Sequence, residues 1–135
     1  MISYDQKTIG FINLFEKITR AQVKDCFQEE DALVFVVQPG QIGIAVGKGG
    51  VNIKKLTNMF KKKIKVIEFN PSPEKFMLSL IYPTRPKEIR LDGEKLILKT
   101  ENNKQKGQIF GRDRSNLKRI QGILNKYFKF EIVLE

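Results

Sequence analysis

The chain has 135 residues, 41% hydrophobic and 30% charged, enough for one ordinary domain or two very small ones with a packed core. It contains no histidine and one cysteine, which excludes a disulfide scaffold, histidine metal sites and histidine-based general catalysis. The net charge of +10 favours a polyanionic partner, usually nucleic acid; a lysine-rich surface that serves solubility is the alternative.

The sequence shows no membrane or secretory signal. The longest uninterrupted apolar run, residues 32–37, is too short to span a bilayer. The N-terminal stretch, residues 1–11, lacks the basic and apolar regions of a signal peptide. We interpret Cys26 as a small buried residue. These features predict a cytoplasmic protein that does not contact a membrane.

The first half of the chain alternates helical and strand patterns. The expected elements are a helix over residues 8–20, strands over 22–28 and 32–38 that pair as a hairpin, a helix from about Val51, and a strand over 63–69. The second helix carries an apolar stripe of Ile53, Leu56 and Met59/Phe60. The sequence NPSP at residues 70–73 then gives the clearest break in the chain, because residues before proline avoid helical conformations.

After the break the same order of elements begins again. The expected elements are a helix over residues 74–82, strands over 88–92 and 96–100, a polar loop over 101–106, an amphipathic helix after residues 111–114, and a strand over 128–134. This organisation predicts two domains, residues 1–69 and 70–135.

A constant shift in residue number relates the two halves, since adding 64 to the number of Gly47 gives Gly111 in an equivalent place. Without any gap, the shift pairs Leu33 with Ile97, Val46 with Phe110, Ile53 with Leu117, Lys54 with Lys118, Lys55 with Arg119, Leu56 with Ile120 and Val66 with Phe130. We interpret the chain as a duplication of a helix–strand–strand–helix–turn–helix–strand unit.

The sequence GKGG at residues 47–50 lies between two helical segments. Glycines let backbone N–H groups approach a ligand closely, and the helix that follows adds a positive dipole end. The turn therefore suits a phosphate, or it is a corner that needs glycine only for its dihedral angles. A nucleotide-hydrolysing P-loop is rejected, because Ile42 stands where that motif requires glycine and Gly49 follows Lys48.

The run AVGKGGVNI at residues 45–53 resembles the signature of KH nucleic-acid-binding domains. The resemblance implies an α+β fold of two tandem type II KH domains (α-β-β-α-α-β), each a three-stranded sheet with helices on one face. Two such domains in tandem resemble the archaeal NusA-like transcription factors.

The resemblance also implies that single-stranded RNA binds at the turn, about four nucleotides per KH domain. The residues expected to contact RNA in the first copy are Ala45, Val46, Gly47, Lys48, Gly49, Gly50, Ile53, Lys54 and Lys55. Ala45, Val46 and Ile53 are expected to form the floor of the groove. No acidic residue occurs between residues 40 and 56, which agrees with binding of an anion.

The second copy has an altered turn, GRDR, with Arg114 in place of the second glycine. The residues expected to contact RNA there are Gly111, Arg112, Asp113, Arg114, Lys118 and Arg119. Asp113 is expected to pair with an arginine or to cap the helix. Either this copy extends the RNA site with an altered grip, or it is a rigid spacer.

By the resemblance, the expected role is to regulate transcription elongation or termination through nascent RNA, with RNA polymerase as a further partner. We expect a monomer with no enzymatic activity, no cofactor and no metal. The alternative is a protein adaptor for RNA polymerase or ribosomal components, with only auxiliary RNA contact. Residues 8–20 and 101–106 are the surfaces that such an adaptor would use.

Overall fold

The computed structural model describes residues 6–135. Residues 1–5, part of the stretch in which no signal peptide was expected, lie outside the described residues. The chain divides into two compact units, Met1–Asn70 and Pro71–Glu135, called here the first and second unit. A domain in the strict sense folds alone, so the domain ranges 1–69 and 70–135 stay a prediction.

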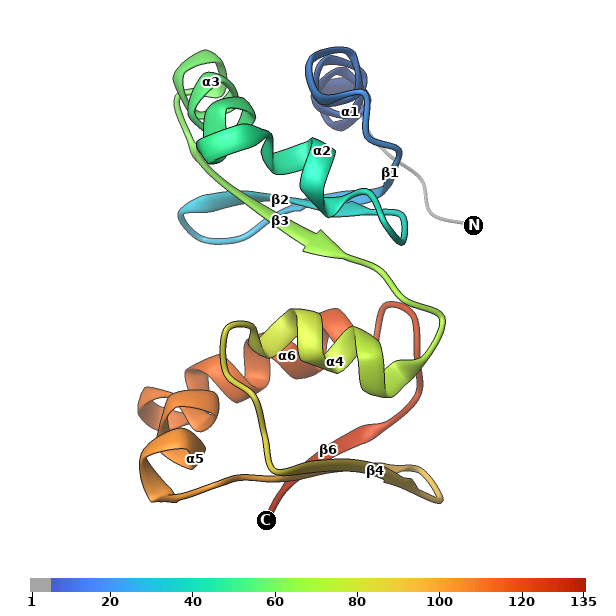
Figure 1. The fold of residues 1–135 in the computed structure, drawn as a ribbon, viewed down its shortest axis with the longest axis vertical. Helices are drawn as coiled ribbons and strands as arrows, with labels where there is room; N and C mark the ends of the chain where they lie inside the picture. Colours follow the sequence, from blue (N-terminus) through green and yellow to red (C-terminus); the bar gives the residue numbers. More distant parts are fainter. Residues whose placement is uncertain (1–5) are drawn as a thin grey trace. The chain divides into compact units, whose positions relative to one another are not determined.

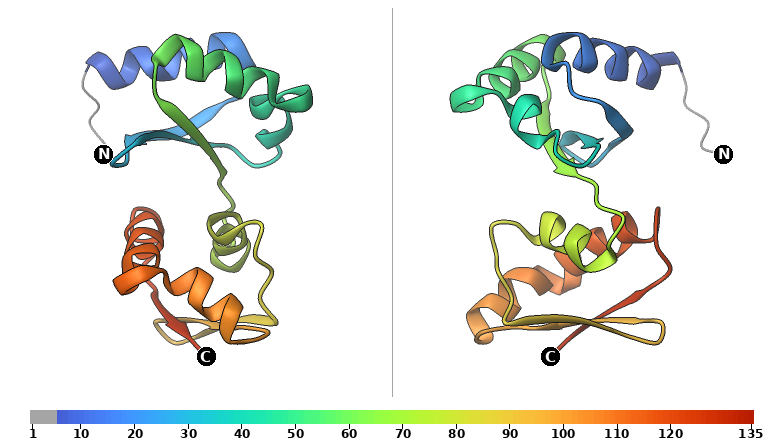
Figure 2. Two further views of the ribbon diagram at one scale, coloured as in Figure 1. Left: turned by 90° about the vertical axis from the view of Figure 1, so that its left-hand side faces the viewer. Right: turned by 45° about the vertical axis from the view of Figure 1, so that its right-hand side comes forward.

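The first unit is a three-stranded sheet with helices on one face (Figures 1 and 2). Its elements are α1 (Gln6–Thr19), β1 (Val23–Gln28), β2 (Ala32–Val37), α2 (Ile42–Val46), the 3-10 turn η1 (Lys48–Gly50), α3 (Val51–Phe60) and β3 (Lys63–Glu68). The strand order is β1-β2-β3. Strand β2 pairs antiparallel with β1, as the predicted hairpin requires, and parallel with β3.

The second unit repeats this topology. Its elements are α4 (Pro73–Ile81), β4 (Glu88–Asp92), β5 (Lys95–Lys99), α5 (Asn103–Phe110), the 3-10 turn η2 (Arg112–Arg114), α6 (Ser115–Leu124) and β6 (Glu131–Leu134). Strand β5 pairs antiparallel with β4 and parallel with β6, and the helices again lie on one face of the sheet (Figure 2). The predicted order of elements is therefore present twice.

The central strand organises the core of the first unit. All six residues of β2 are buried, in agreement with its uninterrupted apolar run. Phe35 of β2 stacks on Phe15 of α1 with ring centroids 4.1 Å apart, and both are fully buried. Phe60 of α3 lies edge-on to Phe11, 5.1 Å between centroids. This aromatic cluster joins α1 and α3 to the sheet.

One residue of the predicted stripe on α3 points the other way. Met59 is 47% exposed, while its neighbour Phe60 packs against the core. The period of 3.6 residues leaves the choice between them open, and the ring contact with Phe11 decides it.

The predicted polar loop over residues 101–106 is wrong, because residues 103–106 form the first half of α5. The Asn102 side chain caps the helix by accepting a hydrogen bond from the Gln105 backbone N–H (2.8 Å). The Gln105 side chain in turn accepts one from the Glu101 N–H (2.9 Å). A helix whose only buried residue is Ile109 shows little apolar periodicity, so its polar composition was mistaken for a loop.

The ungapped repeat is also wrong beyond α6. The constant shift relates the first residues of α3 and α6, Val51 and Ser115, but β6 begins at Glu131, four residues later than the shift from Lys63 of β3 would place it. Four residues are therefore inserted before β6, and Phe130 precedes the strand instead of matching Val66 inside β3.

Gln121 of α6 holds this longer connection. Its Nε2 donates a hydrogen bond to the Phe130 carbonyl, and its Oε1 accepts one from the Ile132 N–H, both at 2.8 Å. The side chain thus satisfies one backbone group just before β6 and one inside the strand.

The Phe15–Phe35 stack makes the first unit sensitive to truncation at Phe15. We predict that Phe15→Ala lowers the free energy of unfolding by about 3–5 kcal/mol, since it removes a fully buried ring and leaves a cavity. Chemical denaturation followed by circular dichroism measures the change. Ile9→Ala on the same helix, at a side chain 46% exposed, is the control and should stay within about 1 kcal/mol. Equal effects of the two variants would contradict this account of the core.

Candidate nucleic-acid interface

The first turn, residues 47–50, has glycine at three positions with positive φ. Gly47 has φ 78° and ψ 165°, and a Cβ there would lie 2.9 Å from the Asn52 Nδ2 and from the Val51 Cγ1. Gly49 and Gly50 have φ 64° and 76°, the left-handed region, and a Cβ at either position would meet nothing within 4 Å. Glycine is therefore required at position 47 by the lack of space for a Cβ, and it is favoured at positions 49 and 50 by their dihedral angles.

The second turn, residues 111–114, follows the same backbone path. Gly111 has φ 75° and ψ 172°, and a Cβ there would lie 2.6 Å from the Cβ of Asn116. Asp113 (φ 54°) and Arg114 (φ 63°) occupy the left-handed conformations that Gly49 and Gly50 adopt in the first turn. This conformation costs a non-glycine residue about 1–2 kcal/mol. The altered sequence therefore keeps the shape of the turn at a cost in stability.

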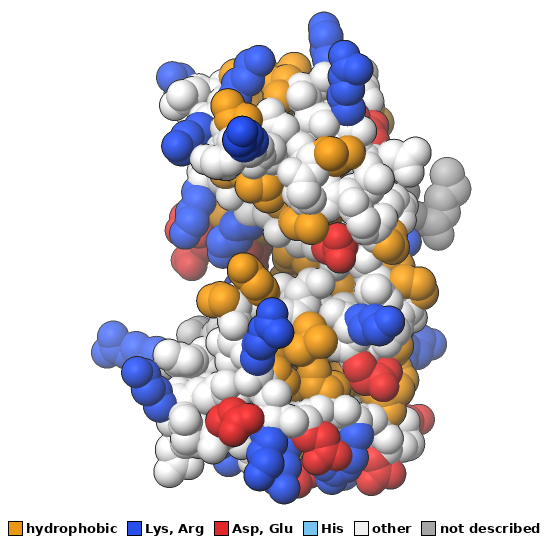
Figure 3. Space-filling view, viewed as in Figure 1, with side chains coloured by type: hydrophobic (Ala, Val, Ile, Leu, Met, Phe, Trp, Pro, Cys, Tyr) orange, Lys and Arg blue, Asp and Glu red, His pale blue; other side chains and the backbone are white. Residues whose placement is uncertain are grey.

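Cations surround both turns. Lys48, Lys54 and Lys55 are exposed, and no acidic residue occurs between residues 40 and 67. From residue 102 to 126 the second unit has seven cations and a single acid, Asp113. Figure 3 shows Lys and Arg side chains over the helical part of the first unit, whereas Asp and Glu, interspersed with Lys, gather over the sheet of the second. The charge distribution favours an anionic ligand on the helix–turn–helix side of each unit.

The apolar residues expected to form the floor of the groove lie deeper than the sequence indicated. Ala45 is fully buried and belongs to the core, and Val46 and Ile53 are half-buried. The exposed apolar side chains beside the turn are Ile44 (48%) and Val51 (55%). Sequence reasoning missed both, because the five-residue α2 shows too little periodicity to fix the phase of Ile44, and Val51 is only the first residue of α3.

In the second unit the predicted contact residues divide into two groups. Arg112, Arg114 and Lys118 are exposed, and the Arg114 guanidinium lies 5.6 Å from the centre of the Phe110 ring. Arg119 is half-buried, and its Nε and Nη2 donate to the Asn116 Oδ1 at 3.3 and 3.2 Å. Part of the Arg119 guanidinium is therefore engaged within the protein.

The roles expected for Asp113 are not found. It forms no ion pair with Arg112 or Arg114 within residues 6–135, and the side chain at the N-cap of α6 makes no capping hydrogen bond. The N-cap position is Arg114, so Asp113 lies one residue too early to cap.

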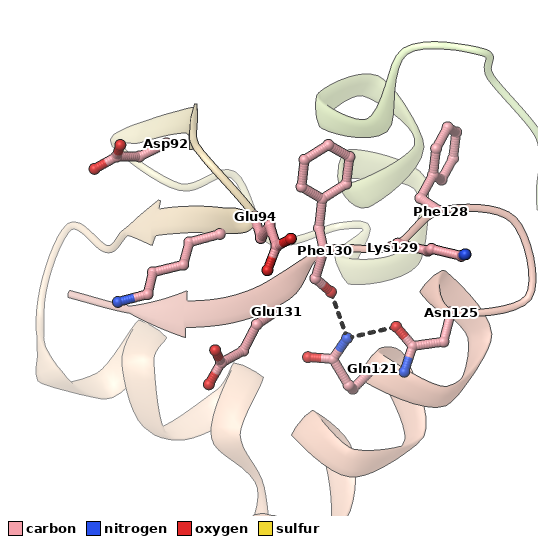
Figure 4. Close-up of a pocket in the computed structure, with 9 residues that line it drawn as sticks. Asp92, Glu94, Gln121, Asn125, Phe128, Lys129, Phe130 and Glu131 are labelled. Atoms are coloured by element: carbon pink, nitrogen blue, oxygen red, sulfur yellow. Dashed lines mark hydrogen bonds between the residues drawn. The ribbon is translucent and has the colours of Figure 1, made fainter.

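A pocket of about 800 Å³ lies at the other end of α6 (Figure 4). It is lined by Asp92, Glu94, Lys95, Gln121, Asn125, Phe128, Lys129, Phe130 and Glu131. Three carboxylates against two lysines give it a less favourable charge for RNA than the turn. Gln121, which lines the pocket from α6, lies seven residues beyond Arg114 of the second turn, about 10 Å along the helix axis. The pocket is therefore not part of the candidate interface.

The described residues also bear on metal binding, on membrane-spanning helices and on the reactivity of the cysteine. No group of three His, Cys, Asp or Glu side chains within residues 6–135 could hold a metal ion. None of the helices described is long and apolar enough to cross a membrane. Cys26 is 3% exposed, and burial, together with the nearby Asp25 carboxylate, raises the pKa of its thiol to about 12. Its reactive thiolate form is therefore scarce near neutral pH.

Comparison with known families matches residues 12–71 to the KH domain model. This match spans the first unit from within α1 to the end of β3, with the GKGG turn inside it. The chain is a KH-domain protein. The second unit of this KH protein has the same strand order and turn geometry, so the predicted α+β fold of two tandem type II KH domains is confirmed.

Several relatives of this KH protein carry the name NusA. It is 42% identical over 82 residues to the "Probable transcription termination protein NusA" of Methanococcus vannielii, covering 61% of this chain and 47% of that protein. It is 31% identical over 121 residues to the protein of the same name from Methanocaldococcus jannaschii, covering 87% and 66%. The alignments thus span about half to two thirds of these relatives.

A solved structure matches the whole chain. The crystal structure of APE1850 has a TM-score of 0.78 and 27% sequence identity, covering 98% of this chain and 100% of that one. The fold of this chain therefore has an experimental counterpart.

The strained residues of the second turn predict a stabilising substitution. We expect Asp113→Gly to raise the free energy of unfolding by about 1 kcal/mol, because glycine adopts φ 54° without strain. Gly49→Ala in the first turn should lower it by a similar amount. Thermal and urea denaturation measure both changes.

Gly43→Ala is the matched control, since Gly43 lies inside α2 with open space around a Cβ and should be neutral or slightly stabilising. A destabilising Asp113→Gly would show that the Asp113 side chain makes a contact that outweighs the backbone strain.

Proposed function

We propose that this KH protein binds single-stranded RNA through its first turn, with the second turn extending the site. The observation that carries the proposal is the turn at residues 47–50. Its two left-handed glycines leave the backbone open, Lys48 projects from it, and no acid lies within the surrounding helices. The start of α3, which no side chain caps, adds a positive dipole end to the same place.

The turn offers one kind of contact to the phosphates of an RNA strand and another to its bases and sugars. Backbone N–H groups of Lys48 and Gly49 and the Lys48 ammonium suit a phosphate, while the exposed side chains of Ile44 and Val51 suit the apolar faces of bases and sugars. Lys54 and Lys55 on α3 provide further charge for neighbouring phosphates. Because such contacts release counterions, binding should weaken steeply with salt.

The second turn offers a related surface with different chemistry. Its backbone follows the path of the first turn, but Asp113 and Arg114 stand where the first turn has glycines, and Arg112 stands in the place of Lys48. Arginine binds a phosphate in a bidentate manner or stacks on a base. This altered grip, and not a spacer role, is the interpretation that the exposed arginines support.

The cellular role that we propose is regulation of transcription elongation or termination through the nascent transcript. Its support is the similarity to relatives named as probable transcription termination proteins. RNA polymerase is the protein partner that this role implies. We propose a protein that acts in the cytoplasm as a monomer, without catalysis of its own.

The alternative is an adaptor that binds RNA polymerase or a ribosomal component and contacts RNA only weakly. Its surfaces would be α1 and the first turns of α5, whose polar residues face solvent. Affinity purification with and without nuclease separates the two hypotheses. Partners that persist after nuclease treatment favour the adaptor, and partners that disappear with the RNA favour direct RNA binding.

Reversing the charge of the first turn should abolish most RNA binding. We predict that Lys48→Asp combined with Gly49→Asp weakens binding of short single-stranded RNA at least about tenfold, and lowers the log–log salt slope by about 0.7 for each phosphate that the turn no longer binds. Aspartate is compatible with this backbone, since Asp113 adopts the same conformation in the second turn. Fluorescence anisotropy over a salt series measures both quantities.

The control variant carries Asn13→Asp and Lys17→Asp, two exposed positions on α1, and changes the net charge by the same three units. Thermal denaturation verifies that both variants fold. If the two variants bind RNA equally well, the turn is only a structural corner and the adaptor becomes the better proposal.

Reversing the charge of the second turn tests whether this unit contacts RNA. We predict that Arg112→Glu with Arg114→Glu weakens binding of RNAs longer than about four nucleotides more than that of tetranucleotides, because the first turn alone accommodates about four. Lys95→Glu with Lys99→Glu, exposed on β5, is the control of equal charge. Unchanged affinity for every length would assign the second unit the role of a spacer.

A further inference from the structure

An asparagine repeats at the same place in both units. In the first unit the Asn52 Nδ2 donates a hydrogen bond to the Ile44 carbonyl at 2.8 Å. In the second, the Asn116 Nδ2 donates to the Ile109 carbonyl at 2.9 Å and to the Gln108 carbonyl at 3.3 Å. Since one constant shift relates Ile44 to Gln108 and the first asparagine to the second, the bond recurs between equivalent residues.

Each asparagine joins the two helices that flank a turn. The acceptors belong to the last four residues of α2 and α5, whose carbonyl groups lack partners within a regular helix. The donors come from the second residue of α3 and α6. Each hydrogen bond therefore fixes both ends of the four-residue turn between the helices.

The first glycine of each turn makes room for this asparagine. A Cβ on Gly47 would lie 2.9 Å from the Asn52 Nδ2, and a Cβ on Gly111 would lie 2.6 Å from the Asn116 Cβ. We call the first glycine of each turn and the asparagine that packs against it the asparagine clasp. Because the glycine has no Cβ, the asparagine side chain has room to reach the carbonyl groups of the preceding helix.

The second unit reinforces its clasp. The Arg119 Nε and Nη2 both donate to the Asn116 Oδ1, which fixes the orientation of the amide so that its Nδ2 points at the carbonyl groups of α5. The turn above it carries the two strained residues Asp113 and Arg114. Extra hydrogen bonds at this clasp offset part of the strain that glycine avoids in the first unit.

We propose that Asn52 and Asn116 are positioning residues, which hold the backbone amides of the two turns in the geometry that receives RNA phosphates, and that Arg119 acts through Asn116. The inference rests on the proposed RNA binding. A turn fixed before binding loses less conformational entropy when the ligand arrives, so the clasp increases affinity without contacting RNA.

The test for the first unit compares Asn52→Ala with Asn58→Ala, an exposed asparagine in the third turn of the same helix. Amide ¹⁵N relaxation of the full chain should show order parameters of residues 48–50 falling from about 0.85 toward 0.6 in Asn52→Ala only. RNA affinity should fall about tenfold, with the salt slope unchanged because no phosphate contact is removed.

The outcomes separate positioning from contact. Reduced affinity with unchanged order parameters would make Asn52 an RNA contact and overturn the proposal, as would mobile turns with unchanged affinity. If the wild type bound no RNA, the proposed function would fail, and the order parameters of Asn52→Ala would still show whether the clasp holds the turn.

Arg119→Lys provides a second variant that keeps the charge and the clasp asparagine. It should raise the mobility of residues 112–114, and its effect on RNA affinity should not add to that of Asn116→Ala, because both changes act on one interaction. Additive losses in this double-mutant cycle would show that Arg119 contacts RNA independently of Asn116.

Discussion

The close approach of two successive helices is the constraint on which each unit depends. Only a four-residue turn separates the end of α2 from the start of α3, and the end of α5 from the start of α6. This approach is possible because Gly47 and Gly111 have no Cβ to meet Asn52 and Asn116. The same geometry places the first backbone amides of the turn close to the positive end of the next helix.

The four positions of the turn are constrained to different degrees, and the two units show this directly. The first position needs glycine because a side chain would collide with the next helix, and both units have it. The third and fourth positions need only a left-handed backbone, which Asp113 and Arg114 adopt at a cost. Divergence of the second turn therefore alters the chemistry of its surface while its shape stays the same.

The sequence predicted the fold well where apolar periodicity or glycine chemistry carried the information. The hairpins, the stripe of α6 and both turns lie where expected. The sequence-based prediction failed at α5, because this polar helix, capped by Asn102, shows little apolar periodicity. It also failed before β6, because four inserted residues break the repeat. It also misplaced Ala45, because burial in a five-residue helix depends on contacts from distant strands. The asparagine clasp was visible as a residue repeated at the same shift, but its role emerges only from the positions of its acceptors in space.

The two turns share one backbone shape but present different binding groups, and this difference gives the duplicated unit a purpose under the proposed function. The glycine turn exposes backbone and makes few demands on the base sequence, whereas the arginine turn offers guanidinium groups with directional hydrogen bonds. Under the proposed function, a single strand held by one turn would meet the other at a raised effective concentration, so two weak sites would together bind more tightly than either alone. Because each unit carries its own clasp, this gain would not require the turns to order one another. In that proposal each unit is a preformed site, and the covalent link between the units provides the cooperation.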